Sequence, residues 1–479
     1  MRLNPATMYS RFAASDPAWD GRFFTGVVTT GIYCLPSCKA RKPKRENVQF
    51  FPSCDAARAS GFRACLKCHP DDYARGADPV LESIEALVAE MRADPARFSN
   101  ARAVVKRSGY GTTRCFELFR QHFHATPADL LLAAKIEAAR RLLASGEEAL
   151  ADVAAASGFE SLSVFHEHFR ELNGMTPADY RRLGSLGSFA VALPDGYPLA
   201  RLLRSLGRDP NSVTERLVGT TYETSADLSG TPGTMTLRLS QDVAIVSVEV
   251  EGGTQGAHRY AAHRIVASML GLDQDAAGFS RLARRLGVGR LVAGRQGLRL
   301  IRTPGVWDGI LWSIIGQQIN LPFACILKRR LIENTGTRLK SGLYALPKPE
   351  AVAGLEAAAM RPWQYSRQKA EYLIGAARLV AASKLDLGAL PLMSATRAER
   401  TLLAVRGLGP WSVNYVMMRS LGFADCVPFG DTGVTSGLKK LFKLEERPDI
   451  DGTRRLMSIF SPHRSLATAH LWQINQPEP

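Results

Sequence analysis

The stretch Val405-Arg406-Gly407-Leu408-Gly409-Pro410-Trp411-Ser412-Val413 does most to define the C-terminal half of the chain. Apolar segments that read as helices, 401–405 and 411–421, lie on either side of its Gly-x-Gly turn. A turn that feeds a helix presents backbone N–H groups to a phosphate. The stretch therefore predicts a helical hairpin whose turn, at Gly407 and Gly409, can bind a phosphate through the backbone.

A carboxylate follows the hairpin, in Pro428-Phe429-Gly430-Asp431-Thr432. Asp431 could simply cap a helix that begins at Thr432. With the hairpin upstream, a catalytic carboxylate is the stronger of the two hypotheses for Asp431.

These segments resemble the helix-hairpin-helix DNA glycosylases, and among them the AlkA-type 3-methyladenine glycosylase II. A second matching segment runs from Trp307 to Ile319, and the resemblance covers about 190–475. It implies that Asp431 is the catalytic carboxylate and that Trp411, Tyr415 and Trp472 line the base pocket, although core packing would equally explain these aromatic residues.

The same resemblance has further implications. Gln318 is a candidate wedge for the gap left by a flipped base, or a satisfied core amide. The carbonyls of Leu403, Val405 and Gly407 are candidates to hold a monovalent cation. Related enzymes that also cut the strand carry a Lys where this chain has Trp411, so a monofunctional hydrolase is expected. An aromatic residue expected near the start of the domain is absent, and Ser205 or a neighbour takes its place.

The expected chemistry follows from charge. N3- and N7-alkylated purines are cationic and leave readily, so no strong general acid is needed. The Asp431 carboxylate would stabilise an oxocarbenium-like sugar and orient water, and electron-rich rings would favour a cationic base by ~0.5–2 kcal/mol.

Two alternating segments, 234–239 and 243–250, predict paired strands in a small α+β subdomain over 188–298. The preceding linker, 184–188, is short and predicts independent motion of the two halves. The apolar run 310–327 is interrupted by polar residues and predicts one buried helix rather than a membrane span.

An internal repeat lies upstream of that linker. Phe119-Arg120 and Thr126-Pro127-Ala128-Asp129 recur as Phe169-Arg170 and Thr176-Pro177-Ala178-Asp179, with turn glycines at Gly109 and Gly158. A plain helical bundle is possible, but the repeat in a basic chain favours two helix-turn-helix units. It resembles the AraC-type DNA-binding domain. The candidate groove contacts are Thr112, Thr113, Arg114, Ser161, Ser163 and His166.

The cysteines gather near the N-terminus. Cys34 and Cys38 form one close pair and Cys65 and Cys68 another, which predicts a four-thiolate zinc site rather than four buried apolar residues. Cys54 has no partner at ligand spacing. Basic residues flank both pairs and are expected to contact DNA phosphates; the candidates are Arg41, Arg45, Arg63 and Lys67.

The segment over about 5–75 resembles the N-terminal domain of the Ada adaptive-response proteins. The resemblance implies that Cys34 takes the methyl group of a DNA methylphosphotriester irreversibly. Alkylation would change the formal charge of a zinc site with four thiolates from −2 to −1 and strengthen DNA binding. The Pro-Cys-His-Arg motif of Ada methyltransferase domains is absent, so direct reversal of guanine damage is not expected.

Composition agrees with a nucleic-acid partner. The formal net charge is +16, and 46% hydrophobic residues exclude wholesale disorder. At ~150 residues per domain, 479 residues suggest about three domains. No secretory signal is recognised, so a cytoplasmic, nucleoid-associated protein without a membrane partner is expected.

The predicted fold is multidomain and mainly α with α+β parts. Its domains are a four-cysteine zinc domain (1–76), an AraC-type double helix-turn-helix (80–183), an α+β subdomain (188–298) and an all-α helix-hairpin-helix glycosylase domain (299–479). The predicted function is an Ada–AlkA fusion: an alkylated-base glycosylase joined to a methylphosphotriester-sensing activator. Its expected partners are alkylated and promoter double-stranded DNA and RNA polymerase, and it is expected to be a monomer. One alternative is a regulator whose C-terminal half binds lesions without cleaving; another is a glycosylase whose zinc domain is only structural.

Overall fold

The computed structural model describes residues 4–76 and 78–474. The chain divides into two compact units, one up to Leu87 and one from Val88 onward. The boundary falls inside helix α4 (Pro79–Ala93). Each unit has its own buried core and is described separately.

The first unit is built on a small sheet in the order β3-β1-β2-β4. Its strands are β1 (Phe24–Val27), β2 (Ile32–Cys34), β3 (Val48–Phe51) and β4 (Arg63–Ala64), and its helices before α4 are α1 (Pro5–Ala13), α2 (Cys54–Ala59) and α3 (Pro70–Ala74). Gly26 sits where a Cβ atom would lie 2.7 Å from Phe51 and 2.8 Å from Phe62. The two rings pack over this glycine because it has no side chain, and they close one face of the sheet.

The second unit begins with the predicted repeat. Its helices are α5 (Ala101–Ser108), α6 (Thr112–Phe123), α7 (Pro127–Ser145), α8 (Leu150–Ala156), α9 (Leu162–Asn173) and α10 (Pro177–Arg182). Gly109 and Gly158 both adopt left-handed backbone, with φ of +72° and +87°, between the two helices of each pair. The predicted turns at these glycines are confirmed, since other residues adopt this conformation at a cost.

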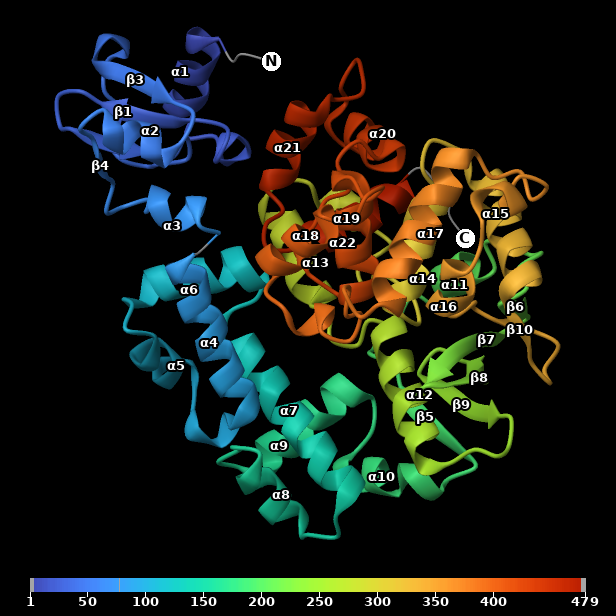
Figure 1. The fold of residues 1–479 in the computed structure, drawn as a ribbon. Coiled ribbons are helices and arrows are strands. Elements are labelled where there is room, and N and C mark those ends of the chain that lie inside the picture. Colours follow the sequence, from blue (N-terminus) through green and yellow to red (C-terminus); the bar gives the residue numbers. More distant parts are fainter. Residues whose placement is uncertain (1–3, 77, 475–479) are drawn as a thin grey trace. The chain divides into compact units, whose positions relative to one another are not determined.

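A five-stranded antiparallel sheet follows, in the order β5-β9-β8-β7-β6. Its strands are β5 (Ser188–Ala192), β6 (Glu215–Val218), β7 (Thr221–Leu228), β8 (Thr231–Leu239) and β9 (Val243–Val250), and its helices are α11 (Leu199–Leu206), α12 (Gly256–Met269) and α13 (Ala276–Arg285). The predicted strand pair is confirmed as β8 and β9, and α12 packs against the sheet (Figure 1).

The prediction that the linker lets the two halves move independently is wrong within this unit. Helices α9 and α10 share one hydrophobic core with the sheet and α12. His263 of α12 lies 2.8 Å from the carbonyl oxygen of Asn173, and Arg259 donates to the carbonyl of Gly184 at 2.9 Å. Separating the halves would expose this apolar surface and leave these carbonyls without their partners, so the linker is part of a packed interface.

The remaining chain is mainly helical around a second core. Its helices are α14 (Val306–Ile315), α15 (Leu321–Thr335), α16 (Pro349–Ala353), α17 (Arg367–Ala381), α18 (Ala395–Leu403), α19 (Pro410–Val416), α20 (Thr432–Phe442), α21 (Ile450–Ser458) and α22 (Arg464–Ile474); β10 (Thr337–Arg338) pairs with β11 (Tyr344–Ala345).

The single helix predicted over 310–327 is wrong. The structure has α14 and α15 with a turn between them, because Asn320 caps α15 by accepting the N–H of Phe323 at 3.0 Å and Pro322 occupies its first turn. Gln318 in this turn has a φ of +56°. Among the described helices, none is long and apolar enough to cross a membrane.

Candidate functional site

The four predicted zinc ligands lie together. The Sγ atoms of Cys34, Cys38, Cys65 and Cys68 are all within 4.8 Å of one another. Strand β2 ends at Cys34 and pairs with β4, so that Cys65 donates its N–H to the carbonyl of Tyr33 at 3.0 Å. Cys54 is buried outside this cluster, and its thiol donates to the carbonyl of Pro70 at 3.4 Å. Four converging thiols match the ligand set of a structural zinc site.

The sulfur atoms differ in their hydrogen bonds. Cys65 accepts the N–H of Lys67, and Cys68 accepts the N–H of Leu35, each at 3.4 Å. Side-chain hydrogen bonds with Cys34 and Cys68 lower the pKa of the Cys38 thiol, and the backbone of Ala40 acts in the same direction. Among the described residues, no backbone N–H donates to the sulfur atom of Cys34. A hydrogen bond from a backbone N–H stabilises a thiolate and makes it a weaker nucleophile. The sulfur of Cys34 has no such bond, so we expect its nucleophilicity to be reduced the least.

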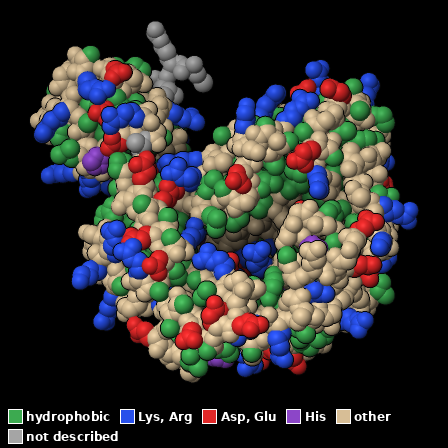
Figure 2. Space-filling view, turned by 60° about the horizontal axis from the view of Figure 1, so that its bottom comes forward, with side chains coloured by type: hydrophobic (Ala, Val, Ile, Leu, Met, Phe, Trp, Pro, Cys, Tyr) green, Lys and Arg blue, Asp and Glu red, His purple; other side chains and the backbone are tan. Residues whose placement is uncertain are grey.

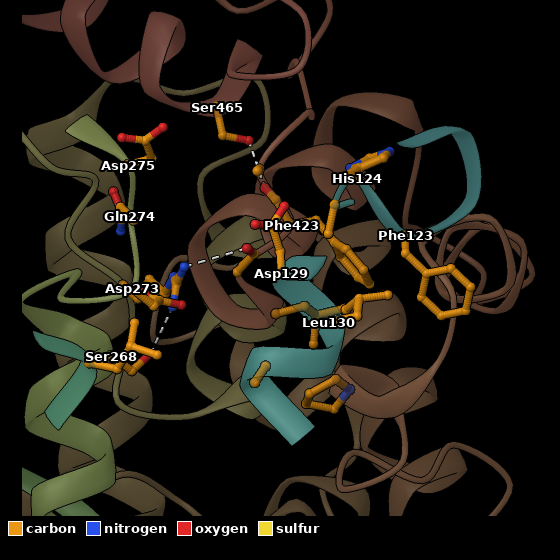
Figure 3. Close-up of a pocket in the computed structure, with 18 of the residues that line it drawn as sticks. Phe123, His124, Asp129, Leu130, Ser268, Asp273, Gln274, Asp275, Phe423 and Ser465 are labelled. Carbon is orange, nitrogen blue, oxygen red and sulfur yellow. Dashed lines mark hydrogen bonds and ion pairs between the residues drawn. The ribbon is translucent and has the colours of Figure 1, made fainter. Parts of the chain in front are cut away.

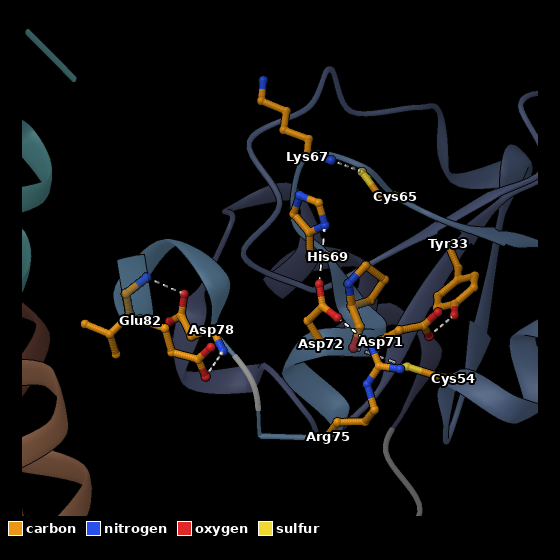
Figure 4. A network of polar contacts seen from close by, with 12 residues as sticks. Tyr33, Cys54, Cys65, Lys67, His69, Asp71, Asp72, Arg75, Asp78 and Glu82 are labelled. Carbon is orange, nitrogen blue, oxygen red and sulfur yellow. Dashed lines mark hydrogen bonds and ion pairs between the residues drawn. The ribbon is translucent and has the colours of Figure 1, made fainter. Parts of the chain in front are cut away.

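A polar network holds the segment that carries Cys65 and Cys68 (Figure 4). The hydroxyl of Tyr33 donates to Asp71 at the start of α3, and Arg58 of α2 reaches the same carboxylate at 3.4 Å. His69 lies 3.5 Å from Asp72. These contacts tie α3 to the sheet and fix the second cysteine pair against the first.

The predicted basic contacts are on the surface. Arg41, Arg45, Arg63 and Lys67 are all exposed. Arg45 also donates to the carbonyl of Val48 at 3.1 Å and lies over the ring of Phe50 at 5.1 Å, and Lys67 lies 3.4 Å from the carbonyl of Lys39. Lys and Arg side chains are spread over the face of the molecule seen in Figure 2.

The hairpin is formed by α18, a tight turn and α19. Gly407 has a φ of +98°, and a Cβ atom there would lie 2.4 Å from the ring of Tyr372. Gly409 is the N-cap residue of α19. The carbonyl of Gly407 accepts the side-chain amide of Gln317 at 2.7 Å, and the carbonyl of Val405 accepts the N–H of Leu408 at 3.0 Å.

Asp431 is the N-cap residue of α20 and also faces two tryptophans. Its Oδ1 accepts the N–H of Val434 and the indole N–H of Trp472, both at 2.9 Å, and its Oδ2 accepts the indole N–H of Trp411 at 3.1 Å. Gly433 leaves room for Trp472, since a Cβ atom there would lie 2.7 Å from the indole. The cap and the candidate catalytic carboxylate are therefore the same group, held in one orientation.

The three aromatic residues predicted to line the pocket are close together. The rings of Trp411 and Tyr415 stack at 5.5 Å with 22° between their planes, and Tyr415 lies 6.4 Å from Trp472. The guanidinium of Arg419 lies over the Tyr415 ring at 5.7 Å. Arg419 is in a π-helical turn, 417–421, that continues α19.

Sequence reasoning missed a cavity beside these rings. It has a volume of about 450 Å³, and Trp472 and Ser205 help to line it. Its most distinctive lining residues are the arginines Arg201, Arg204, Arg208, Arg299 and Arg419. The absent aromatic residue at Ser205 was the only sequence signal, because the arginines come from three segments of the chain that are about 100 residues apart.

The turn that carries Gln318 is anchored to the hairpin. Gln317 donates to the carbonyl of Gly407 and to the hydroxyl of Ser412, at 2.7 and 2.9 Å. The ammonium group of Lys369 contacts the carbonyls of Ile315 and Gln317 at 2.5 and 3.0 Å. This turn therefore presents Gln318, which is exposed, in a fixed position relative to the hairpin.

The helix-turn-helix candidates lie at the N-termini of α6 and α9. Thr112, Thr113, Arg114, Ser161 and Ser163 are exposed, and His166 is half-buried. Leu162 and Val164 beside them are also exposed, although both are apolar.

A second cavity, of about 620 Å³, lies where α6 and α7 meet later segments, and Figure 3 shows Asp129, Asp273 and Phe423 facing it.

Comparison with known proteins gives three family matches in order along the chain. The metal binding domain of Ada matches residues 7–71, a helix-turn-helix domain matches 104–183, and the HhH-GPD superfamily of base excision DNA repair proteins matches 311–462.

The relatives include one that aligns along almost the whole chain and others that align with its C-terminal part. A probable bifunctional transcriptional activator/DNA repair enzyme AlkA of Mycobacterium tuberculosis is 27% identical over 97% of this chain and 95% of its own length. A DNA-3-methyladenine glycosylase of Bacillus subtilis is 32% identical over 42% of this chain and 68% of its own. A 3-methyladenine DNA-glycosylase structure from Archaeoglobus fulgidus covers 60% of this chain and 97% of its own, at 20% identity and a TM-score of 0.53, which establishes a shared fold for that region.

Proposed function

The chain belongs to the family of bifunctional Ada/AlkA-type transcriptional activators and DNA repair glycosylases, and from this premise we propose that its glycosylase half releases N3- and N7-alkylated purines from DNA. The observation that carries this proposal is the Asp431 carboxylate, held by two indole donors beside a stacked aromatic pair.

Asp431 acts as the catalytic carboxylate in this proposal. When the bond between C1′ and the base nitrogen breaks, its electron pair leaves with the base and positive charge develops on the sugar. The fixed carboxylate stabilises that charge, and water then adds to C1′ and loses a proton. The base must first leave the stack, and Gln318 on its anchored turn fills the gap.

The enzyme is proposed to be a monofunctional hydrolase. Trp411 follows the hairpin, where an amine nucleophile would be needed for strand cleavage, and its indole is committed to Asp431. We expect the product to be an unbroken DNA strand in which C1′ carries an oxygen derived from water.

We also propose that Cys34 accepts a methyl group from a DNA methylphosphotriester. The four-cysteine cluster fits zinc, which would keep these thiols deprotonated at neutral pH. The Cys34 sulfur bonds to the methyl carbon, the carbon–oxygen bond breaks, and a phosphodiester leaves with the electron pair. The lack of backbone donors to Cys34 supports it over the other three, while Cys68 is the most exposed alternative.

The remaining roles follow from the same domains. Arg41, Arg45, Arg63 and Lys67 would contact phosphates, and α6 and α9 would read promoter DNA. We propose that methylation strengthens this binding and that RNA polymerase is the downstream partner, with the protein working as a monomer on nucleoid DNA in the cytoplasm.

For the hairpin we propose that the carbonyls of Leu403, Val405 and Gly407 bind a monovalent cation. The cation would have to share the Gly407 carbonyl with the side-chain amide of Gln317.

The test of the glycosylase is release of free base from duplex DNA containing N3-methyladenine, comparing the parent protein with Asp431→Asn. We expect release by the parent and a loss of about 10²-fold or more in the variant. Release by neither would leave a regulator with an inactive lesion-binding half.

For the methyl acceptor, the protein is exposed to DNA carrying methylphosphotriesters, digested and mapped by mass spectrometry. One methyl group on Cys34 is expected. A methyl group on Cys68 would transfer the role to that residue, and no added mass would make the zinc domain purely structural.

A further inference from the structure

The first turn of α9 exposes two apolar side chains. Leu162 is 44% exposed and Val164 is 43% exposed. Further along the same helix, Phe165 and Phe169 are fully buried, and their rings lie 5.6 Å apart. Because all four residues from 161 to 164 are exposed and the core begins at Phe165, the first turn projects beyond the core. Leu162 and Val164 therefore meet solvent in the folded domain.

The equivalent turn of the first repeat carries different side chains. Helices α6 and α9 each have 12 residues and begin 50 positions apart, at Thr112 and Leu162. The two copies of the Thr-Pro-Ala-Asp motif have the same offset. Leu162 and Val164 of α9 thus correspond to Thr112 and Arg114 of α6. One recognition helix presents a hydroxyl and a guanidinium at these positions, and the other presents two hydrocarbon side chains.

Arg114 is suited to a guanine. Its side chain is exposed, and its only printed ion pair joins it to Glu117 on the same surface at 3.5 Å. An exposed ion pair contributes little to stability, so Arg114 can leave Glu117 for a base edge at small cost. In the major groove, guanine offers two acceptors, O6 and N7, which arginine binds together.

Leu162 and Val164 are suited to a thymine. Their side chains neither donate nor accept hydrogen bonds, so on a base edge they can recognise only an apolar group. In the major groove that group is the C5-methyl of thymine. Contact between the methyl and these side chains removes apolar surface from water, which is favourable.

The position of the two residues favours DNA over a protein as their partner. They begin the second helix of a helix-turn-helix unit, inside the region 104–183 that matches this domain. They also take the place that Arg114 occupies in the other unit, and the exposed hydroxyl-bearing Ser163 lies between them. The surface is therefore continuous with the helix that would enter the groove.

We propose that α6 and α9 read half-sites of different chemistry, with Arg114 binding a guanine and Leu162 and Val164 contacting thymine methyl groups. This inference rests on the proposed reading of promoter DNA by the two helices, and it specifies the base that each selects. Paired recognition helices contact DNA about one helical turn apart, so the guanine and thymine half-sites are expected about 10 base pairs apart.

The experiment first selects the preferred duplex from a random library with the full-length protein, before and after its exposure to DNA carrying methylphosphotriesters. Fluorescence anisotropy at one salt concentration then measures binding to this duplex and to two kinds of single replacement. Deoxyuracil in place of thymine removes only the 5-methyl group, and 7-deazaguanine in place of guanine removes only the N7 acceptor.

The parent is compared with the double variant Leu162→Ala/Val164→Ala and with Arg114→Met. Val218→Ala is the matched control, because Val218 is an apolar residue of β6 that is 67% exposed. All the substituted residues are exposed, so the variants are expected to fold, which circular dichroism verifies.

We expect each critical deoxyuracil to weaken binding by the parent about three- to fourfold, the loss for one buried methyl group. The double variant should bind the thymine and deoxyuracil duplexes equally and still respond to 7-deazaguanine. Arg114→Met should show the reverse pattern and lose a 7-deazaguanine effect of about fivefold or more. Val218→Ala should behave as the parent does.

Equal binding of the thymine and deoxyuracil duplexes by the parent would overturn the thymine assignment and point to a protein partner for Leu162 and Val164. A deoxyuracil effect that persists in the double variant would overturn it too, and a 7-deazaguanine effect that persists in Arg114→Met would overturn the guanine assignment. If the parent selects no sequence in either state, the proposed promoter reading fails, and this inference fails with it.

Discussion

The indole nitrogen of Trp472 lies 2.9 Å from Oδ1 of Asp431, although 41 residues separate the two along the chain. Trp411 reaches the other carboxylate oxygen from the hairpin at 3.1 Å. With the N–H of Val434, three donors converge on one carboxylate. Such pre-organised hydrogen bonds let the charge act in the transition state without first reorienting.

Trp472→Phe tests this arrangement. The phenyl ring keeps an aromatic wall but removes one donor, so the carboxylate is less well oriented. A hydrogen bond to a charged group contributes about 1.5–3 kcal/mol, so we expect base release to slow by roughly 10–100-fold with little loss of stability. Trp19→Phe, in the first unit, is the control and should leave the rate unchanged. Full activity in Trp472→Phe would show that the donor is dispensable.

The two classes of cysteine in the first unit can be separated by metal content. Cys38→Ser removes one thiolate of the cluster and should leave the purified protein with well below one zinc per chain. Cys54→Ser changes an equally buried cysteine outside the cluster and should retain one zinc. Elemental analysis by mass spectrometry gives both values. Equal zinc in the two variants would contradict the four-thiolate site.

The two turn glycines of the helix-turn-helix repeat should not be equally sensitive. Both have positive φ, so alanine costs about 1–2 kcal/mol in backbone strain at either position. At Gly158 the new Cβ would also lie 2.8 Å from the backbone of Ala96, whereas at Gly109 it meets nothing. We therefore expect Gly158→Ala to lower the free energy of unfolding more than Gly109→Ala in urea titrations. The reverse order would show that the first repeat is packed more tightly than described.

Stability should fall in mild acid because of buried histidines. Burial lowers the pKa of His263 to about 4 and that of His470 to about 3. Between these values and the ordinary pKa of about 6.5, the unfolded state binds protons that the folded state excludes, so the free energy of unfolding falls as the pH falls.

Each histidine should contribute about 1–3 kcal/mol to that loss between pH 6.5 and pH 4. Denaturant titrations of the parent at pH 7 and pH 5 measure the total, and His263→Leu should reduce the difference between the two pH values. A difference that His263→Leu leaves unaltered would assign the acid sensitivity to other groups.

The sequence by itself determined the local features of this protein. Cysteine spacing predicted the cluster, the repeated glycines predicted the two turns, and alternation predicted β8 and β9, because each of these depends on residues close together in the chain or on a fixed periodicity. It also singled out Asp431, although it offered the helix cap and the catalytic carboxylate as alternatives. In the structure Asp431 caps α20 and also faces Trp411 and Trp472. One carboxylate can do both because it has two oxygens and several acceptor positions.

Only the tertiary structure decided what depends on distant segments. The core shared by α9, α10, α12 and the sheet removed the expected freedom of the linker, since apolar surfaces on both sides of it bury one another. The turn at 316–320 begins α15 through the local Asn320 cap and Pro322, but its position against the hairpin depends on Gln317, which bonds to Gly407 about 90 residues away. The cavity that joins Arg201 to Arg419 has no periodicity or spacing that could reveal it. Its charge arises from packing alone, which brings together side chains whose order in the chain carries no such pattern.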